Sequence, residues 1–193
     1  KTKPISSFKI GPGKKGKARP KKYQVYASKF YYNAVSMMQE YIIRRSSKND
    51  ASALSKLICE NAAVLLLPYY NDEQMDAFVK FYSATEMQAK VATQNIYCAT
   101  LDNEIVGCIA LDKNQVVGFY TSLQFQKRGI GKLLLEFIEK FAQSQGINEL
   151  QLSASPQALA YYLRHGWQKI KEVTCYYFSI GFEETLMKKE IGW

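Results

Sequence analysis

Residues 126–131, with the sequence QKRGIG, have the residue types of an anion-binding loop. They lie between a strand-forming segment that ends at Thr121 and a periodic apolar segment that begins near Leu133. Glycine lets the backbone approach a ligand closely, and the free N–H groups and dipole at a helix N-terminus attract negative charge. The loop therefore predicts a site for a phosphate or pyrophosphate. The alternative is a glycine loop that only begins a helix.

Two common nucleotide-binding loops do not fit these residues. A Walker-type loop needs Ser or Thr after Gly-Lys, but Leu133 follows Gly131 and Lys132. The dinucleotide fingerprint needs a third glycine, and Leu134 occupies its place. Kinase-like and nicotinamide-dependent functions are therefore disfavoured.

Hydrophobic periodicity predicts the elements that must position this loop. The expected strands are 41–44, 95–99, 105–111, 115–121, 149–153, 169–177 and 182–189, and the expected helices are 50–61, 71–79, 87–91, 133–142 and 155–166. The three strands between 95 and 121 should be adjacent and antiparallel, and Ser155 should cap the last helix. Together these elements predict an α+β chain.

Charge divides the chain into two segments. The 193 residues include 26 Lys and Arg against 17 Asp and Glu, a net charge of +9. Ten of the bases and none of the acids lie in residues 1–39, so residues 40–193 hold 16 bases and 17 acids, a net charge of −1. This distribution predicts a basic extension with an amphipathic helix from Tyr23 to Met38 over residues 1–40, and one globular domain over 41–193.

Several classes of protein are disfavoured by composition. The longest apolar run, 62–67, is far shorter than a bilayer span, and no secretory signal follows the basic N-terminus. The four cysteines form no Cys-x-x-Cys pair and the chain has one histidine, so a zinc site is not expected. Dispersed thiols in a chain of this size indicate a reducing compartment, which predicts a cytoplasmic protein.

Two motifs, taken together, resemble the GNAT (GCN5-related) N-acetyltransferases. Gln126, Gly129 and Gly131 match that family's acetyl-CoA signature, and residues 158–167 match its aromatic helix that ends in glycine and an aromatic residue. Residues 182–187 also resemble the last strand of small bacterial-type members. The resemblance extends from about residue 41 to residue 189. It implies a mixed, mostly antiparallel central sheet flanked by helices.

The resemblance implies acetyl-CoA as the cofactor, in a slot formed where the sheet splays. The pyrophosphate would bind the backbone amides of residues 128–132, and the pantetheine arm would lie along residues 120–123 as an added strand. The implied cofactor-binding residues are Tyr120, Thr121, Ser122, Leu123, Gln126, Lys127, Arg128, Gly129, Ile130, Gly131, Lys132 and Ser155. Ser155 stands where many members have a cofactor-contacting Asn, and helix capping is its alternative role.

Tyr162 occupies the position of the family's tyrosine acid, which would protonate the leaving thiolate. A phenol, whose pKa is about 10, can serve such a leaving group. Tyr161 is the rival, about 100° around the helix, and ordinary packing is the alternative for both. No carboxylate lies in residues 116–122, where some members place a water-activating glutamate. The general base is therefore unassigned, with the conceivable candidates Glu60, Glu73, Asp112 and His165.

These features predict an acetyl-CoA-dependent N-acetyltransferase that transfers an acetyl group to a primary amine by direct attack on the thioester. We expect the acceptor, a small molecule or a peptide, to enter beside residues 60–81, whose aromatic and acidic side chains suit a cationic amine. The basic arm could bind RNA or another polyanion, or residues 23–40 could form a homodimer interface. The alternative function is a non-catalytic acyl-CoA-binding or nucleic-acid-associated module.

Overall fold

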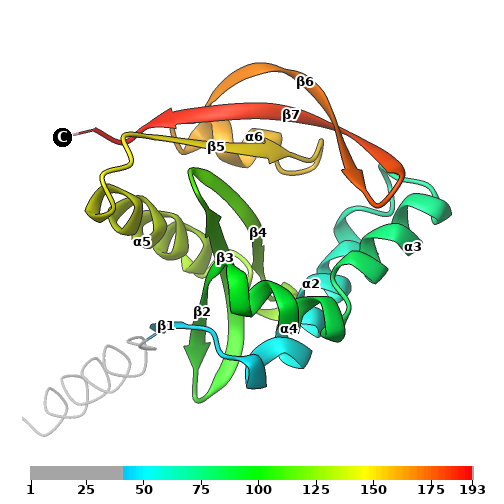
Figure 1. Ribbon diagram of the computed structural model, residues 1–193, viewed down its shortest axis with the longest axis horizontal. Helices are drawn as coiled ribbons and strands as arrows, with labels where there is room; N and C mark the ends of the chain where they lie inside the picture. The colour runs from blue at the N-terminus through cyan, green and yellow to red at the C-terminus, as the bar shows by residue number, and fades with distance from the viewer. Residues whose placement is uncertain (1–40, 193) are drawn as a thin grey trace, which may run out of the picture. The chain divides into compact units, whose positions relative to one another are not determined.

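The computed structural model describes residues 41–192 (Figure 1). The basic arm and the helix expected from Tyr23 to Met38 lie outside the described residues, so the division of the chain at residue 40 stays a prediction. No helix of residues 41–192 is long and apolar enough to cross a membrane.

Seven strands form one sheet in the order β1-β2-β3-β4-β5-β7-β6 (Figure 1). Neighbouring strands are antiparallel except for β4 and β5, which are parallel. The predicted α+β class and its mixed, mostly antiparallel sheet are therefore confirmed. The strands are β1 (Ile42–Arg45), β2 (Asn95–Leu101), β3 (Glu104–Asp112), β4 (Gln115–Thr121), β5 (Glu149–Ala154), β6 (Gln168–Tyr177) and β7 (Ile180–Glu190).

Helices cover both faces of this sheet (Figure 1). One hydrophobic cluster packs the three helices α2, α3 and α4 against Cys108 of β3 and Phe182 of β7, and a second packs α5 against Ile109 of β3 and Leu152 of β5. The helices are α2 (Ala51–Leu65), α3 (Asp72–Phe81), α4 (Ala84–Thr93), α5 (Ile130–Ser144) and α6 (Leu159–Arg164), with short 3₁₀ turns at Lys48–Asp50 and Leu123–Phe125.

The ends of the helices follow from their capping residues. Asn71 accepts a hydrogen bond from the Gln74 N–H, and the Gln74 side chain accepts one from the Asn71 N–H, so α3 begins with a capping box. Gly166, with φ of 84°, ends α6, where the Gly166 and Trp167 N–H groups donate to Leu163 and Tyr162 carbonyls.

The expected capping role of Ser155 is wrong. The N-cap residue of α6 is Ala158, and the Ser155 carbonyl accepts hydrogen bonds from the N–H groups of Ala158 and Leu159. A turn that contains Pro156 therefore precedes the helix, and α6 begins three residues later than its proline suggests.

A β-bulge interrupts β4 opposite the middle of β3. Between the Cys108–Tyr120 and Ala110–Val117 pairs, one residue of β3 faces two residues of β4. Gly118 lies in the bulge with φ of 57°, a left-handed conformation that glycine adopts without strain. The bulge therefore changes the direction of the side chains just before the end of β4.

β4 and β5 separate soon after they meet. Their ladder contains the single facing pair Gln115 and Gln151, supported by a hydrogen bond from the Gln151 N–H to the Asn114 carbonyl. Towards Thr121 and Ala154 the two strands diverge, while each keeps its other neighbour, β3 or β7. The splayed sheet that the resemblance implied is therefore present.

Candidate active site

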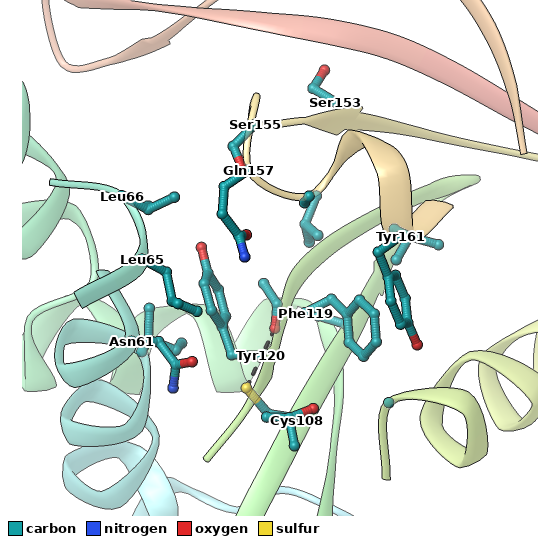
Figure 2. Close-up of a pocket in the computed structure, with 18 of the residues that line it drawn as sticks. Asn61, Leu65, Leu66, Cys108, Phe119, Tyr120, Ser153, Ser155, Gln157 and Tyr161 are labelled. Carbon is teal, nitrogen blue, oxygen red and sulfur yellow. Dashed lines mark hydrogen bonds between the residues drawn. The ribbon is translucent and has the colours of Figure 1, made fainter. Parts of the chain in front are cut away.

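A cavity of about 880 Å³ lies where β4 and β5 diverge. Its walls come from α2, α3 and α4 on one side and from the α5 and α6 region on the other. Figure 2 shows the ring of Tyr120 standing in it, with Asn61 and Leu65 of α2 and the Gln157 side chain nearby and with Phe119 and Tyr161 beyond. The cavity therefore joins the predicted anion loop to the side from which the acceptor is expected.

The glycine loop forms the start of α5, as predicted. Gly129 is the N-cap residue and has φ of 85°, and a Cβ at this position would have no heavy atom within 4 Å. Helix α5 begins at Ile130, so its first N–H groups lack partners within the helix and face the loop. Lys127 and Lys132 line the cavity on either side of these groups. The loop can therefore hold an anion with backbone donors and two cations.

Most of the residues expected at the cofactor site line this one cavity. Ser122, Leu123 and Arg128 do not; Arg128 instead places its guanidinium 5.0 Å from the centre of the Phe125 ring. The predicted residues in the cavity wall are Tyr120, Thr121, Gln126, Lys127, Gly129, Ile130, Gly131, Lys132 and Ser155.

The edges of β4 and β5 that face the cavity have no strand partner beyond Gln115 and Gln151 among the described residues. Phe119 lies in the bulge and Tyr120 follows it on the open edge of β4, and both line the cavity. An extended ligand can hydrogen-bond to such an edge in the way that an added strand does.

The two tyrosines of α6 have different surroundings. The Tyr162 side chain is buried against Trp167 and Phe119, with ring centres 5.8 and 6.2 Å away. The Tyr161 ring stacks on His165 at 4.2 Å, and burial raises the pKa of Tyr161 to about 12. Burial raises the pKa of Tyr162 above its usual range. Both phenols line the cavity and hold their protons at neutral pH.

A buried hydroxyl group without a partner among the described residues indicates whether these residues suit coenzyme A. Tyr161 Oη is buried and has no hydrogen-bond partner within residues 41–192. A Cβ at Gly131 would lie 2.8 Å from this oxygen, so only glycine leaves room for the phenol beside the first turn of α5. Donors without acceptors therefore converge at the loop, and the acceptor-rich pyrophosphate of coenzyme A fits them.

Three of the four conceivable bases lie outside the cavity wall. Glu60 and Glu73 are exposed, and Glu60 pairs with Lys56; Asp112 is exposed at the end of β3. His165 does line the cavity, and its Nδ1 lies 2.8 Å from the Tyr161 carbonyl oxygen.

Sequence reasoning missed Glu184. This side chain lies on β7, is 9% exposed and lines the cavity. Its two-residue spacing from the apolar Phe182 places both on one face of a strand but does not show that this face meets the cavity. Among the described residues no group of His, Cys, Asp and Glu side chains could hold a metal ion.

Comparison with known proteins agrees with this geometry. A family model described as an acetyltransferase (GNAT) domain matches residues 66–191, which is well over half of the chain. The chain therefore belongs to the GNAT acetyltransferase family. A search of curated proteins found no match.

Solved structures share the fold at low sequence identity. A GCN5-related N-acetyltransferase from Rhodopseudomonas palustris has a TM-score of 0.73 and 22% identity, over 79% of this chain and 97% of that one. PaiA N-acetyltransferase from Thermoplasma acidophilum, solved with coenzyme A, has a TM-score of 0.68 and 19% identity, over 78% and 99%. YncA from Salmonella typhimurium, solved with acetyl-CoA, has a TM-score of 0.56 and 17% identity, over 80% and 95%.

Proposed function

We propose that this protein is an acetyl-CoA-dependent N-acetyltransferase that acetylates a primary amine. The observation that carries the proposal is the anion loop at the start of α5, which opens into the cavity between the diverging β4 and β5. Membership of the GNAT family and the coenzyme A bound in PaiA and YncA support the choice of donor.

Acetyl-CoA, when bound, supplies a thioester carbonyl that an amine can attack directly. The backbone donors from Gly129 to Lys132 and the Tyr161 hydroxyl would bind the pyrophosphate, and the open edge of β4 would orient the pantetheine arm. Tyr162 holds a proton on its Oη atom and donates it to the leaving sulfur. Burial raises the pKa of Tyr162, so the phenol is protonated at the pH of the reaction and can donate a hydrogen bond to the sulfur as the C–S bond breaks.

Calorimetric titration of acetyl-CoA tests the donor site. We expect the wild-type chain to bind and Gly129→Glu to lose binding, because the new carboxylate would lie where the pyrophosphate does. Gly146→Glu is the matched control: Gly146 also has a positive φ, of 76°, and open space around a Cβ, but it lies after α5 and outside the cavity wall.

The Gly146→Glu control distinguishes loss of the binding site from a general effect of backbone strain on acetyl-CoA binding. Both substitutions place an L-residue in a left-handed conformation, at a cost of about 1–2 kcal/mol each. Equal affinity in wild type and Gly129→Glu would contradict the proposed site, and no binding to folded wild type would contradict the donor.

A further inference from the structure

Glu184 is a buried carboxylate without a cation. Its side chain is 9% exposed, and none of the ion pairs formed within residues 41–192 includes it. Its neighbour Glu183 lies on the other face of β7, is exposed, and accepts a hydrogen bond of 2.9 Å from Thr174 Oγ1. A buried acid that lacks a cationic partner needs an explanation, because removing a charge from water is costly.

Aromatic rings surround this carboxylate on the acceptor side of the cavity. We call Tyr70, Tyr82, Tyr120 and Tyr177 the tyrosine wall. All four line the cavity, and burial, with a smaller contribution from the charge of Glu184, raises the pKa of each. The ring centre of Tyr82 lies 6.1 Å from that of Tyr120 and 6.2 Å from that of Tyr177. The carboxylate therefore faces a space bounded by aromatic surfaces.

Other titratable groups near this space do not neutralise Glu184. Cys175 of β6 lowers the pKa of the carboxyl, and Tyr162 of α6 lies within range of its charge. Lys90 of α4 lines the same cavity, but its Nζ donates to the Phe81 carbonyl at 3.0 Å and lies 4.0 Å from Glu86. Burial raises the pKa of Glu184 to about 7, so near neutral pH it can both accept and release a proton.

An aliphatic ammonium group matches this chemistry. The cation would pair with the carboxylate, and its carbon skeleton and charge would contact the faces of the tyrosine wall. We propose that Glu184 binds the ammonium group of the acceptor and is the general base that deprotonates it. This inference rests on the proposed acetyltransferase function and assigns the acceptor to primary amines that are cationic at neutral pH.

The proton and bond changes balance without a further reactant. The ammonium group gives one proton to the Glu184 carboxylate and becomes a neutral amine. Its lone pair forms the new C–N bond with the acetyl carbonyl carbon, the C–S bond breaks, and the sulfur takes the Tyr162 proton. The nitrogen's second proton is lost as the amide forms and returns, through solvent, to the Tyr162 oxygen. The Glu184 proton leaves to solvent and restores the carboxylate.

Benzylammonium, a cationic primary amine with one aromatic ring, is a suitable probe. We expect it to bind the full chain saturated with coenzyme A, measured by calorimetry at about pH 8, where Glu184 is ionised. Glu184→Gln should weaken binding by roughly tenfold or more, because the amide keeps the shape and removes the charge. The matched control Glu183→Gln should bind as wild type does.

Lowering the pH supplies a second readout on the unaltered chain. Benzylammonium keeps its charge from about pH 8 to about pH 6, whereas Glu184 gains a proton in this interval, so wild-type affinity should fall and Glu184→Gln should show no such fall. Absence of benzylammonium binding to the wild type, or equal binding by Glu184→Gln, would overturn the inference.

Acetyl-CoA affinity separates this inference from the proposed function. Glu184→Gln should keep wild-type affinity for acetyl-CoA, since the carboxyl is assigned to the acceptor. If acetyl-CoA binds but the amine result fails, the assignment of Glu184 is wrong and the donor site stands. If acetyl-CoA does not bind to the folded wild type, the proposed function itself is wrong.

Discussion

Tyr161 and Tyr162 are adjacent in α6, yet the structure separates their roles. Tyr161 directs its hydroxyl to the start of α5, beside Gly131, whereas Tyr162 is within range of the charge of Glu184. We propose that the first contact serves the donor's phosphates and the second the reacting centre. Each phenol can therefore be tested by removing one oxygen atom.

We expect Tyr162→Phe to lower kcat by roughly 100-fold, because general acid catalysis contributes on that order or more. Its affinity for acetyl-CoA should stay that of wild type. Tyr161→Phe should do the opposite and weaken acetyl-CoA binding with a smaller effect on kcat, since its hydroxyl faces the anion loop. Release of free coenzyme A measures kcat, and calorimetry measures the affinity for acetyl-CoA.

If Tyr162→Phe turned over as fast as wild type, the assignment of Tyr162 as the general acid would be wrong. The enzyme could then protonate the leaving thiolate through water. A chain that binds acetyl-CoA but releases no coenzyme A with any amine would instead favour the non-catalytic binding module.

At the scale of the secondary-structure elements, the bulge in β4 determines which backbone groups face the cavity. It adds one residue between the Val117 and Tyr120 pairings, and Gly118 is the residue that adopts the left-handed conformation there. A Cβ at position 118 would have no heavy atom within 4 Å, so backbone strain rather than a clash at the Cβ opposes substitution.

Gly118→Val should therefore reduce the free energy of unfolding by about 1–2 kcal/mol. It should also weaken acetyl-CoA binding, because relief of the strain would shift Phe119 and Tyr120 along the edge that we propose binds the pantetheine arm. Denaturant unfolding and calorimetry measure the two effects.

Gly146→Val is the control for this experiment. Its positive φ gives a similar loss of stability, but it should leave acetyl-CoA affinity unchanged. Equal affinities in the two variants would show that the bulge does not position the donor.

At the scale of the whole chain, the described domain contains every residue assigned to the donor and acceptor sites. We therefore expect a chain of residues 41–193 to fold and to bind acetyl-CoA as the full chain does. The full chain, with its ten bases and no acids in residues 1–39, should bind RNA in a salt-dependent way that the shorter chain loses. Thermal unfolding, calorimetry and a filter-binding titration test these expectations.

RNA binding that persists in the shorter chain would assign the contact to the domain. Loss of acetyl-CoA affinity would show instead that the arm contributes to the donor site, and the proposed boundary at residue 40 would then be wrong.

Much of the fold could be predicted because local patterns and tertiary packing agree. The strand at 115–121 was predicted to the residue, and Gly146 was correctly expected to end α5, whose buried face includes Leu134 and Ile138. The predicted capping role of Ser155 was wrong because a serine before a proline fits a turn as well as a helix cap. The glycine within the pattern of β4 was a usable sign of a bulge.

Glu184 could not be recognised in the same way. It follows another glutamate in a strand whose period of two assigns one of the pair to each face, and the sequence does not reveal which face meets the cavity. That knowledge depends on the pairing of β7 between β5 and β6 and on Tyr82 and Tyr120, which approach from distant parts of the chain.

If the chain binds acetyl-CoA as proposed, the divergence of β4 and β5 would also make its stability depend on the concentration of acetyl-CoA. The half-sheets β1–β4 and β5–β7 meet through the Gln115–Gln151 pair. A donor bound between β4 and β5 would therefore add contacts that link the two half-sheets. By mass action, such a ligand stabilises the native state by RT ln(1 + [L]/Kd). The lifetime of this protein against unfolding and proteolysis would then rise and fall with the cell's supply of acetyl-CoA.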